Sequence, residues 1–267
     1  PRATRSTRPC TAVIAASSFT RLASDDASVT RIVEPEIVPD TEVASRLRSL
    51  TLLANSPLGV LYAVRTLVQM VRRSATGVAV PCAAVVDWPD IGERGQWGGN
   101  ARDEVPWTAR WKLNVVEESV GLSVDAGGRT RRELGQEHIS QAHGEGVTIV
   151  PYILHLEQVA LYAGLMSRSD LTSTPDPSKP LPPEYVPGLC MASPATIGIV
   201  GDWMELIAGY EHISAIEVWL SEDRSECHCS RCAGKEPFEL EVRCIQEAFG
   251  RARAKKPGLA LRILLTQ

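Results

Sequence analysis

Two adjacent carboxylates, Glu222 and Asp223, follow directly after an apolar stretch that ends in Trp219 and Leu220. Two carboxylates in one pocket can divide the roles of general acid and general base, because proximity and burial push their pKa values apart. Placing a charged pair directly after a buried strand also costs stability, which suggests that the pair has a function. The sequence therefore predicts Glu222 and Asp223 as catalytic residues.

Further polar and aromatic residues lie near the ends of other apolar stretches. Aromatic faces beside carboxylates and an arginine suit the binding of a sugar ring. The alternative for any single one of these residues is a place on a solvated loop. The predicted substrate-binding residues are Arg94, Trp97, Glu118, Tyr152, His155 and Trp219.

Three cysteines crowd into one short segment, Cys227-x-Cys229-x-x-Cys232, with His228 between them and Cys244 nearby. These spacings are compatible with a structural zinc or another thiophilic metal, and the predicted metal ligands are Cys227, Cys229 and Cys232. The alternative is a disulfide in an exported protein, or free thiols. In either case the segment follows the predicted catalytic pair and would support the loop that carries it. No cofactor is expected for the chemistry itself.

The composition limits the classes of protein to which the chain can belong. Its 267 residues are 44% hydrophobic and 22% charged, with a formal net charge of -4. That is the composition of a soluble globule with a buried core, and the mild acidity argues against a nucleic-acid partner. No apolar run approaches the roughly 18–20 residues of a membrane span, so no membrane partner is expected. The basic start of the chain resembles an export signal only faintly, which leaves a cytoplasmic and an exported location both open.

The elements that must position these residues fall into two parts. Residues 1–84 contain short apolar runs typical of weak strands, a strand over Leu47–Leu53 and an amphipathic helix over Val60–Val71. They predict a small α+β domain. In residues 85–267 apolar strands alternate with helices, which predicts a parallel sheet with right-handed crossovers. The expected strands are Gly95–Trp97, Leu113–Glu117, Val147–Leu154, Ile213–Leu220 and Leu259–Leu265, and the expected helices Pro106–Trp111, Arg131–His143, Ala195–Tyr210 and Pro237–Lys255.

The second part fits either an open doubly wound sheet or the early part of a (β/α)8 barrel. It has no glycine-rich dinucleotide motif after a strand and no phosphate-binding loop of the Gly-Lys-Ser/Thr type. In a barrel, the carboxyl ends of all strands share one mouth, where the predicted site residues would meet.

Residues 52–71, LLANSPLGVLYAVRTLVQMV, resemble the end of the small α+β domain that precedes the catalytic barrel in family 20 glycoside hydrolases, the β-N-acetylhexosaminidases. Three later segments are similar to that family's first three barrel strands and one to the approach to the fourth. They are residues 86–95, 112–114, 146–151 and 189–194.

The resemblance implies a glycosidase with a partial TIM-type barrel, acting on O-glycosidic bonds of N-acetylhexosamine-containing glycans. In that family a glutamic acid protonates the leaving oxygen, a neighbouring aspartate orients the sugar's acetamido group, and an arginine binds sugar hydroxyls. These roles fall on Glu222, Asp223 and Arg94. Since the acidic pair stands in reversed order, Asp223 is the alternative for the general acid. The histidine motifs after the second and third strands are replaced, around Glu118 and His155, so the resemblance implies a divergent branch. A non-catalytic carbohydrate-binding scaffold and a metal-binding protein centred on residues 227–232 are the alternatives.

Only five strands are predicted after residue 84, whereas a (β/α)8 barrel closes with eight. The expectation is a C-terminally truncated chain, or one in which an oligomer partner supplies the missing half-barrel. Such a chain is expected to be poorly active and prone to aggregation by itself, because half a barrel leaves strand edges uncovered.

Overall fold

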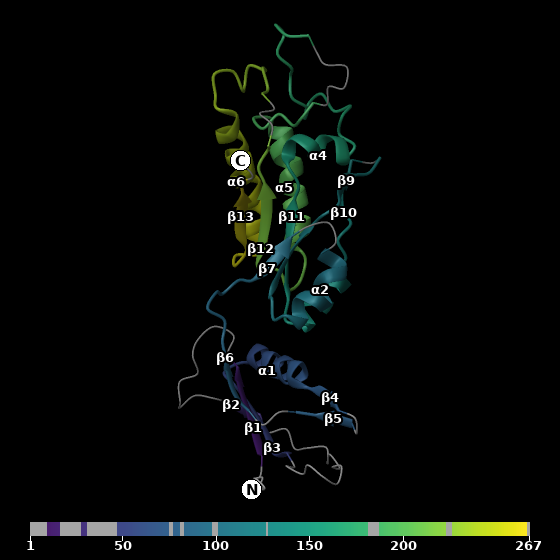
Figure 1. Ribbon diagram of the computed structural model, residues 1–267. Coiled ribbons are helices and arrows are strands. Elements are labelled where there is room, and N and C mark those ends of the chain that lie inside the picture. The colour runs from purple at the N-terminus through teal and green to yellow at the C-terminus, as the bar shows by residue number, and fades with distance from the viewer. Residues whose placement is uncertain are drawn as a thin grey trace, which may run out of the picture. The chain divides into compact units, whose positions relative to one another are not determined.

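The computed structural model describes residues 10–16, 28–30, 47–74, 77–80, 83–97, 101–126, 128–180, 187–222 and 226–265 (Figure 1). The chain divides into two compact units, one of residues 1–94 with 110–113 and one of residues 95–109 with 114–267. The sequence places the boundary after residue 84. The difference arises because the strand Ala84–Asp87 pairs in parallel with Cys10–Ala16 and so belongs to the sheet of the first unit.

In the residues that the structure describes, the first unit is a four-stranded sheet with one helix and a small hairpin. The sheet has the order β2-β3-β1-β6, in which β1 pairs in parallel with β3 and β6, and β2 pairs antiparallel with β3. The elements are β1 (Cys10–Ala16), β2 (Ser28–Thr30), β3 (Leu47–Ala54), α1 (Pro57–Met70), β4 (Arg72–Ser74), β5 (Gly77–Ala79) and β6 (Ala84–Asp87).

Helix α1 begins where its capping residues dictate. The Ser56 hydroxyl accepts a hydrogen bond from the Gly59 backbone N–H at 3.0 Å, and a proline follows at the first helical position. The predicted helix is confirmed, and Val64 and Leu67 pack against the core of this unit, whereas Val68 is 65% exposed. Tyr62 and Ala63 are buried instead and pack with Leu52 of β3.

The second unit is built on a parallel sheet of five strands in the order β13-β12-β11-β8-β7. Every pair in this sheet is parallel, so the unit is mixed α/β as the sequence predicts. All five predicted strands are confirmed, with shifts of up to two residues at their ends. They are β7 (Gly95–Trp97), β8 (Val115–Ser119), β11 (Thr148–Ile153), β12 (Ala215–Trp219) and β13 (Ala260–Leu264). Closure into part of a (β/α)8 barrel, with a partner for the remaining strands, stays a prediction.

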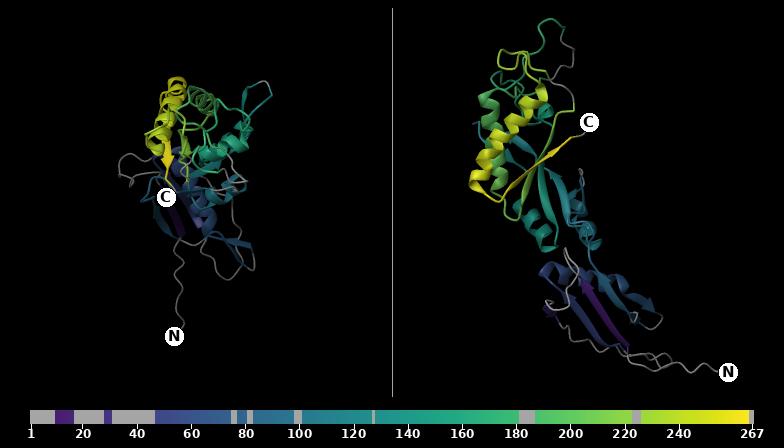
Figure 2. Two further views of the ribbon diagram at one scale, coloured as in Figure 1. Left: turned by 90° about the horizontal axis from the view of Figure 1, so that it is seen from above. Right: turned by 90° about the vertical axis from the view of Figure 1, so that its left-hand side faces the viewer.

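Five helices and a hairpin complete the described part of the second unit. They are α2 (Ala101–Arg110), β9 (Leu122–Val124), β10 (Thr130–Arg132), α3 (Gln136–Gly144), α4 (Leu156–Tyr162), α5 (Pro194–Ala208) and α6 (Pro237–Lys255). The sequence missed α4 and the antiparallel hairpin, and it merged β10 with α3 into one helix. Figure 2 shows α5 and α6 side by side along the sheet. None of the helices in the described ranges is both long and apolar enough to cross a bilayer.

The two faces of this sheet have different surroundings, because successive side chains of a strand point to opposite faces. One face, the helix face, packs against α5 and α6 and forms the main core, with Ile149, Ile216 and Val218 fully buried. The other face, the site face, begins with a small apolar cluster of Val115, Val150 and Ala215. Further along the strands, the site face carries aromatic and charged side chains.

Candidate functional site

Three aromatic side chains meet on the site face, and we call them the aromatic cluster: Trp97, Tyr152 and Trp219. The Trp219 ring stacks on Tyr152, with 4.4 Å between ring centroids and 9° between planes. Trp97 meets Trp219 edge to face at 5.0 Å and 82°. The structure thus brings together three of the predicted substrate-binding residues. Trp97 is 64% exposed, whereas Trp219 and Tyr152 are buried.

Carboxylates and an arginine surround the aromatic cluster. Glu217 is buried and accepts a hydrogen bond from the Trp219 indole N–H at 2.8 Å. Arg262 of β13 lies beside Glu217 in register, and its guanidinium is 3.9 Å from the Glu117 carboxylate. The sequence does not distinguish Glu117, Glu217 or Arg262 from their neighbours by any polar-apolar pattern. Once the strands are located, Glu217 lies two residues from Trp219 and so faces the same side, which is the signal that could find it.

Tyr152 shows the electrostatic character of this face. Burial raises the pKa of its phenol, a side-chain hydrogen bond with Ser119 lowers it, and the carboxylates of Glu217, Glu118 and Glu117 raise it further. Tyr152 is therefore a neutral hydrogen-bonding group at neutral pH, and its buried ring is stacked on Trp219.

Glu118, one of the predicted substrate-binding residues, does not lie with this group. It is buried on the helix face, where its carboxylate is 2.7 Å from Nε2 of His138 on α3. Adjacent residues of a strand point to opposite faces, so the neighbour Glu117 faces the aromatic cluster in its place. Glu118 therefore does not share the site face with the aromatic cluster, and its role in substrate binding stays a prediction.

His155 and Glu222 come together beyond the ends of β11 and β12. The His155 ring lies edge-on to Trp219, with centroids 5.4 Å apart. Its Nδ1 is 2.6 Å from the Leu220 carbonyl, and since a carbonyl only accepts, Nδ1 carries the hydrogen. Its Nε2 then faces Glu222, 3.7 Å from the carboxylate.

The turn that carries Glu222 is held from below by α6. The buried Glu241 carboxylate accepts hydrogen bonds from the Ser221 backbone N–H at 3.0 Å and from the Ser221 hydroxyl at 2.9 Å. The Glu222 backbone N–H donates to Glu157 at 3.2 Å, while the Glu222 side chain remains about half exposed. Burial raises the pKa of Glu241, although the bonds to Ser221 oppose that shift. The turn thus fixes the Glu222 backbone, while its half-exposed carboxylate lies beside His155 and in contact with solvent.

Arg94 belongs to the first unit. Its guanidinium donates to the Lys112 carbonyl at 2.8 Å and lines a cavity of about 280 Å³ that also includes Asp87 and Trp88. A role of Arg94 in sugar binding stays a prediction, as do the catalytic roles of Glu222 and Asp223. Asp223 lies outside the described residues.

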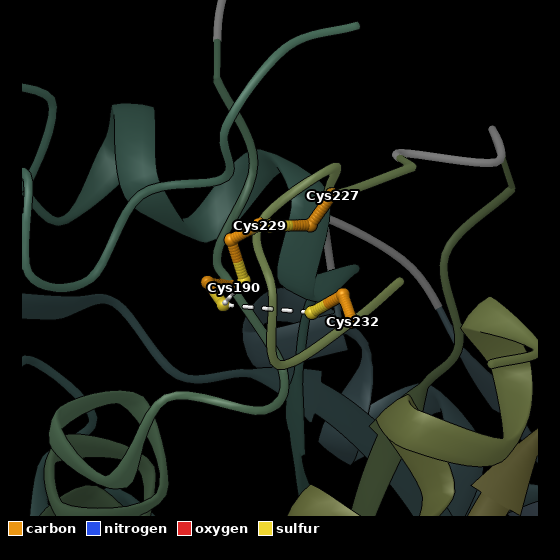
Figure 3. A group of neighbouring side chains, drawn as sticks. All are labelled: Cys190, Cys227, Cys229 and Cys232. Atoms are coloured by element: carbon orange, nitrogen blue, oxygen red, sulfur yellow. Dashed lines mark hydrogen bonds between the residues drawn. The ribbon is translucent and has the colours of Figure 1, made fainter. Parts of the chain in front are cut away.

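Four cysteines gather at a second place in the second unit: Cys190, Cys227, Cys229 and Cys232 (Figure 3). All their sulfur atoms lie within 4.8 Å of one another. The three predicted metal ligands are therefore together, but the fourth sulfur is that of Cys190 and not of Cys244, which is buried in α6. The five cysteines whose side chains the structure describes are free thiols. No local spacing could reveal Cys190, because it lies on another segment of the chain.

Comparisons with known proteins extend the fold assignment. No family model and no curated protein sequence matches the chain. Among solved structures, a β-N-acetylhexosaminidase from Bacteroides fragilis aligns with a TM-score of 0.63 at 13% identity, over 95% of this chain and 54% of that one. A family 20 exo-β-N-acetylglucosaminidase from Vibrio harveyi aligns at 0.61 and 16%, over 94% and 45%. A chitobiase from Flavobacterium johnsoniae aligns at 0.63 and 17%, over 82% and 39%.

These similarities show a fold like that of family 20 glycoside hydrolases, at identities that imply wide divergence. The chain spans about half the length, or less, of the solved enzymes it matches.

Proposed function

We propose that this chain is a glycoside hydrolase-like protein that acts on O-glycosidic bonds, with N-acetylhexosamine-containing glycans as its substrate class. The observation that carries the proposal is the stacked pair Trp219 and Tyr152, flanked by Trp97, Glu117 and Glu217 on one face of a parallel sheet. The fold shared with solved family 20 enzymes supports the choice of reaction.

The aromatic cluster suits a pyranose because the C–H faces of a sugar pack on aromatic rings while its hydroxyls need polar partners. Glu117 and Glu217 are acceptors for sugar hydroxyls, and Arg262 is a donor. The partly exposed Trp97 is the ring that a ligand can reach from solvent. Arg94 is proposed as a further ligand for sugar hydroxyls on the strength of its sequence context.

Glu222 is the proposed general acid. It would donate its proton to the glycosidic oxygen as the bond to the anomeric carbon breaks, so that the leaving group departs as a neutral alcohol. Asp223 is proposed to orient the sugar's 2-acetamido group, whose own oxygen would attack the anomeric carbon. His155 holds the Trp219–Glu222 corner together through its bond to the Leu220 carbonyl. Water would then open the cyclic intermediate at the anomeric carbon and return a proton to Glu222, so the proposed reaction needs the substrate's own acetamido group and water but no cofactor.

The test compares Glu222→Gln with wild type on two substrates that differ in leaving group. Removing a general acid costs typically 10²–10⁴-fold in rate. We expect a loss of that size on a β-linked N-acetylglucosamine disaccharide, whose alkoxide leaves only when protonated. The second substrate is the nitrophenyl β-glycoside of N-acetylglucosamine. On it we expect a much smaller loss in rate, because nitrophenolate leaves without a proton.

The matched control is Glu239→Gln, an exposed glutamate on α6 that pairs with Arg243 at 2.6 Å. It should leave both rates unchanged. Equal losses of Glu222→Gln on both substrates would contradict the role of general acid. Wild-type protein that binds N-acetylglucosamine but turns over neither substrate would replace the proposal with a non-catalytic binding scaffold.

A further inference from the structure

We propose that Cys190, Cys227, Cys229 and Cys232 together bind one zinc ion in a structural site that is closed by four thiolates. This inference goes beyond the proposed function and does not depend on it.

The sulfur geometry is that of a tetrahedral site. With zinc–sulfur bonds of about 2.3 Å, the edges of an S₄ tetrahedron are about 3.8 Å long. The sulfur of Cys190 is 3.7 Å from the sulfurs of both Cys229 and Cys232. The remaining distances among the four stay within 4.8 Å. A disulfide would need about 2.05 Å, so the sulfurs stand at metal-bridged and not at bonded separations.

The donor set selects the metal and the role. Four sulfurs with no carboxylate among them favour a soft or borderline cation such as zinc and disfavour magnesium and calcium. Four protein ligands also fill every position of a tetrahedral zinc, so no position remains for a substrate or an activated water. His228 is not needed as a ligand, and its Nε2 lies 3.5 Å from the Glu226 carboxylate.

Groups around the sulfurs stabilise negative charge, as the surroundings of a metal thiolate must. Four thiolates around one zinc carry a net charge of -2, and hydrogen bonds to the sulfurs delocalise it. The Thr174 backbone N–H donates to the Cys227 sulfur at 3.3 Å. The positive charge of Arg231 interacts favourably with Cys190, Cys229 and Cys232, and the Cys232 backbone N–H donates to the Cys229 carbonyl at 3.0 Å, which closes the turn between these two ligands.

The site would join two segments that are far apart in the sequence. Cys190 lies just before α5, next to the bridge between Thr172 and Leu189. The other three cysteines lie in the loop between β12 and α6, and this loop begins at Ser221 and Glu222. Figure 3 shows the loop with its cysteine side chains turned toward Cys190. Because metal binding of this kind is coupled to folding, zinc should stabilise the whole unit.

The experiment measures metal in the full chain, purified through a tag without histidines. Elemental analysis should find one zinc per chain. Cys190→Ser and Cys229→Ser should reduce the zinc content to near zero. Cys244→Ser, which changes a buried thiol outside the group, should retain the full zinc content. Cobalt added to the metal-free chain should give the intense visible bands of tetrahedral coordination together with thiolate-to-cobalt charge transfer.

A second measurement keeps the test decisive if a serine variant fails to fold. Wild-type protein is treated with a thiol-alkylating reagent before and after chelation, and the modified peptides are identified by mass spectrometry. Chelation should expose Cys190, Cys227, Cys229 and Cys232 to alkylation and should lower Tm reversibly. Iron in place of zinc, full zinc in Cys190→Ser, a disulfide within the group, or alkylation unaffected by chelation would each overturn the proposal.

Discussion

The helix face and the site face of the five-stranded sheet are made by alternate residues of the same strands, and they differ in almost every respect. The helix face is filled by aliphatic side chains such as Ile149 and Ile216, which are fully buried against α5 and α6. The site face carries stacked aromatic rings, two carboxylates and an arginine. Glu117 and Glu118 are neighbours in β8, yet Glu117 faces the aromatic cluster whereas Glu118 pairs with His138 of α3.

The difference shows on which face of the sheet charged side chains can be placed at a low cost in stability. A buried charge on the helix face needs a dedicated partner, as Glu118 has in His138, because it is surrounded by the core. On the site face the polar groups interact with one another: Glu217 accepts a hydrogen bond from Trp219, and Glu117 lies near Arg262. Substitutions on the two faces should therefore change different properties of the protein.

The largest effect is expected from the truncation of a buried side chain on the helix face. Ile216→Ala should lower the free energy of unfolding by about 2–5 kcal/mol, because it removes buried methylene groups and leaves a cavity. Urea unfolding measures this loss. Sugar binding by the fraction that remains folded should be unchanged. A loss of sugar affinity without a loss of stability would show that the two faces are not independent.

A smaller effect is expected from the two glutamates of β8, each replaced by alanine. Glu118→Ala removes the buried carboxylate that pairs with the partly buried His138 and should cost about 1–3 kcal/mol of stability. Glu117→Ala should cost less, about 0–1 kcal/mol, because its pair with Arg262 is long and partly solvated. The order should reverse for sugar affinity measured by calorimetry. Equal costs in stability would contradict the assignment of the two residues to opposite faces.

The sequence predicts the elements of this fold better than the orientation of their side chains. The central strands β11 and β12 could be located because buried parallel strands are continuous apolar runs, and α6 could be located by its clear amphipathic period. The same continuity hides the two-residue alternation, since a strand that is buried on both faces gives no polar-apolar pattern. The sequence therefore gives no reason to place Glu117 and Glu217, and not Glu118, on the site face.

Contacts between segments that are far apart in the chain also could not be predicted from the sequence. The Cys-x-Cys-x-x-Cys segment is visible by its spacing, but Cys190 joins it only through the fold. Glu241 looks like any polar residue of an amphipathic helix. The structure shows it buried under the Ser221–Glu222 turn.

The smallest effect is expected from Glu241, as a dependence of stability on pH. Burial, as the largest cause, and the nearby Glu157 carboxylate raise its pKa, while the bonds to Ser221 and the charge of His155 lower it, and the net shift is upward. Above the ordinary glutamate pKa, folded protein therefore holds a proton that unfolded protein has lost. The contribution of Glu241 to stability is then fully present at low pH, and it falls as pH rises from the unfolded to the folded pKa.

Glu241→Gln keeps a hydrogen-bond acceptor for Ser221 but cannot ionise. The free energy of unfolding is measured in urea across that pH range. The value for Glu241→Gln, relative to that of wild type, should increase as pH rises and should become constant above the pKa of Glu241 in the folded protein. Glu239→Gln, an exposed change on the same helix, should run parallel to wild type. A stability difference between Glu241→Gln and wild type that stays constant with pH would mean that the Glu241 carboxyl is not held protonated under the turn. The Ser221–Glu222 corner would then rest on an ionised carboxylate hydrogen-bonded to Ser221.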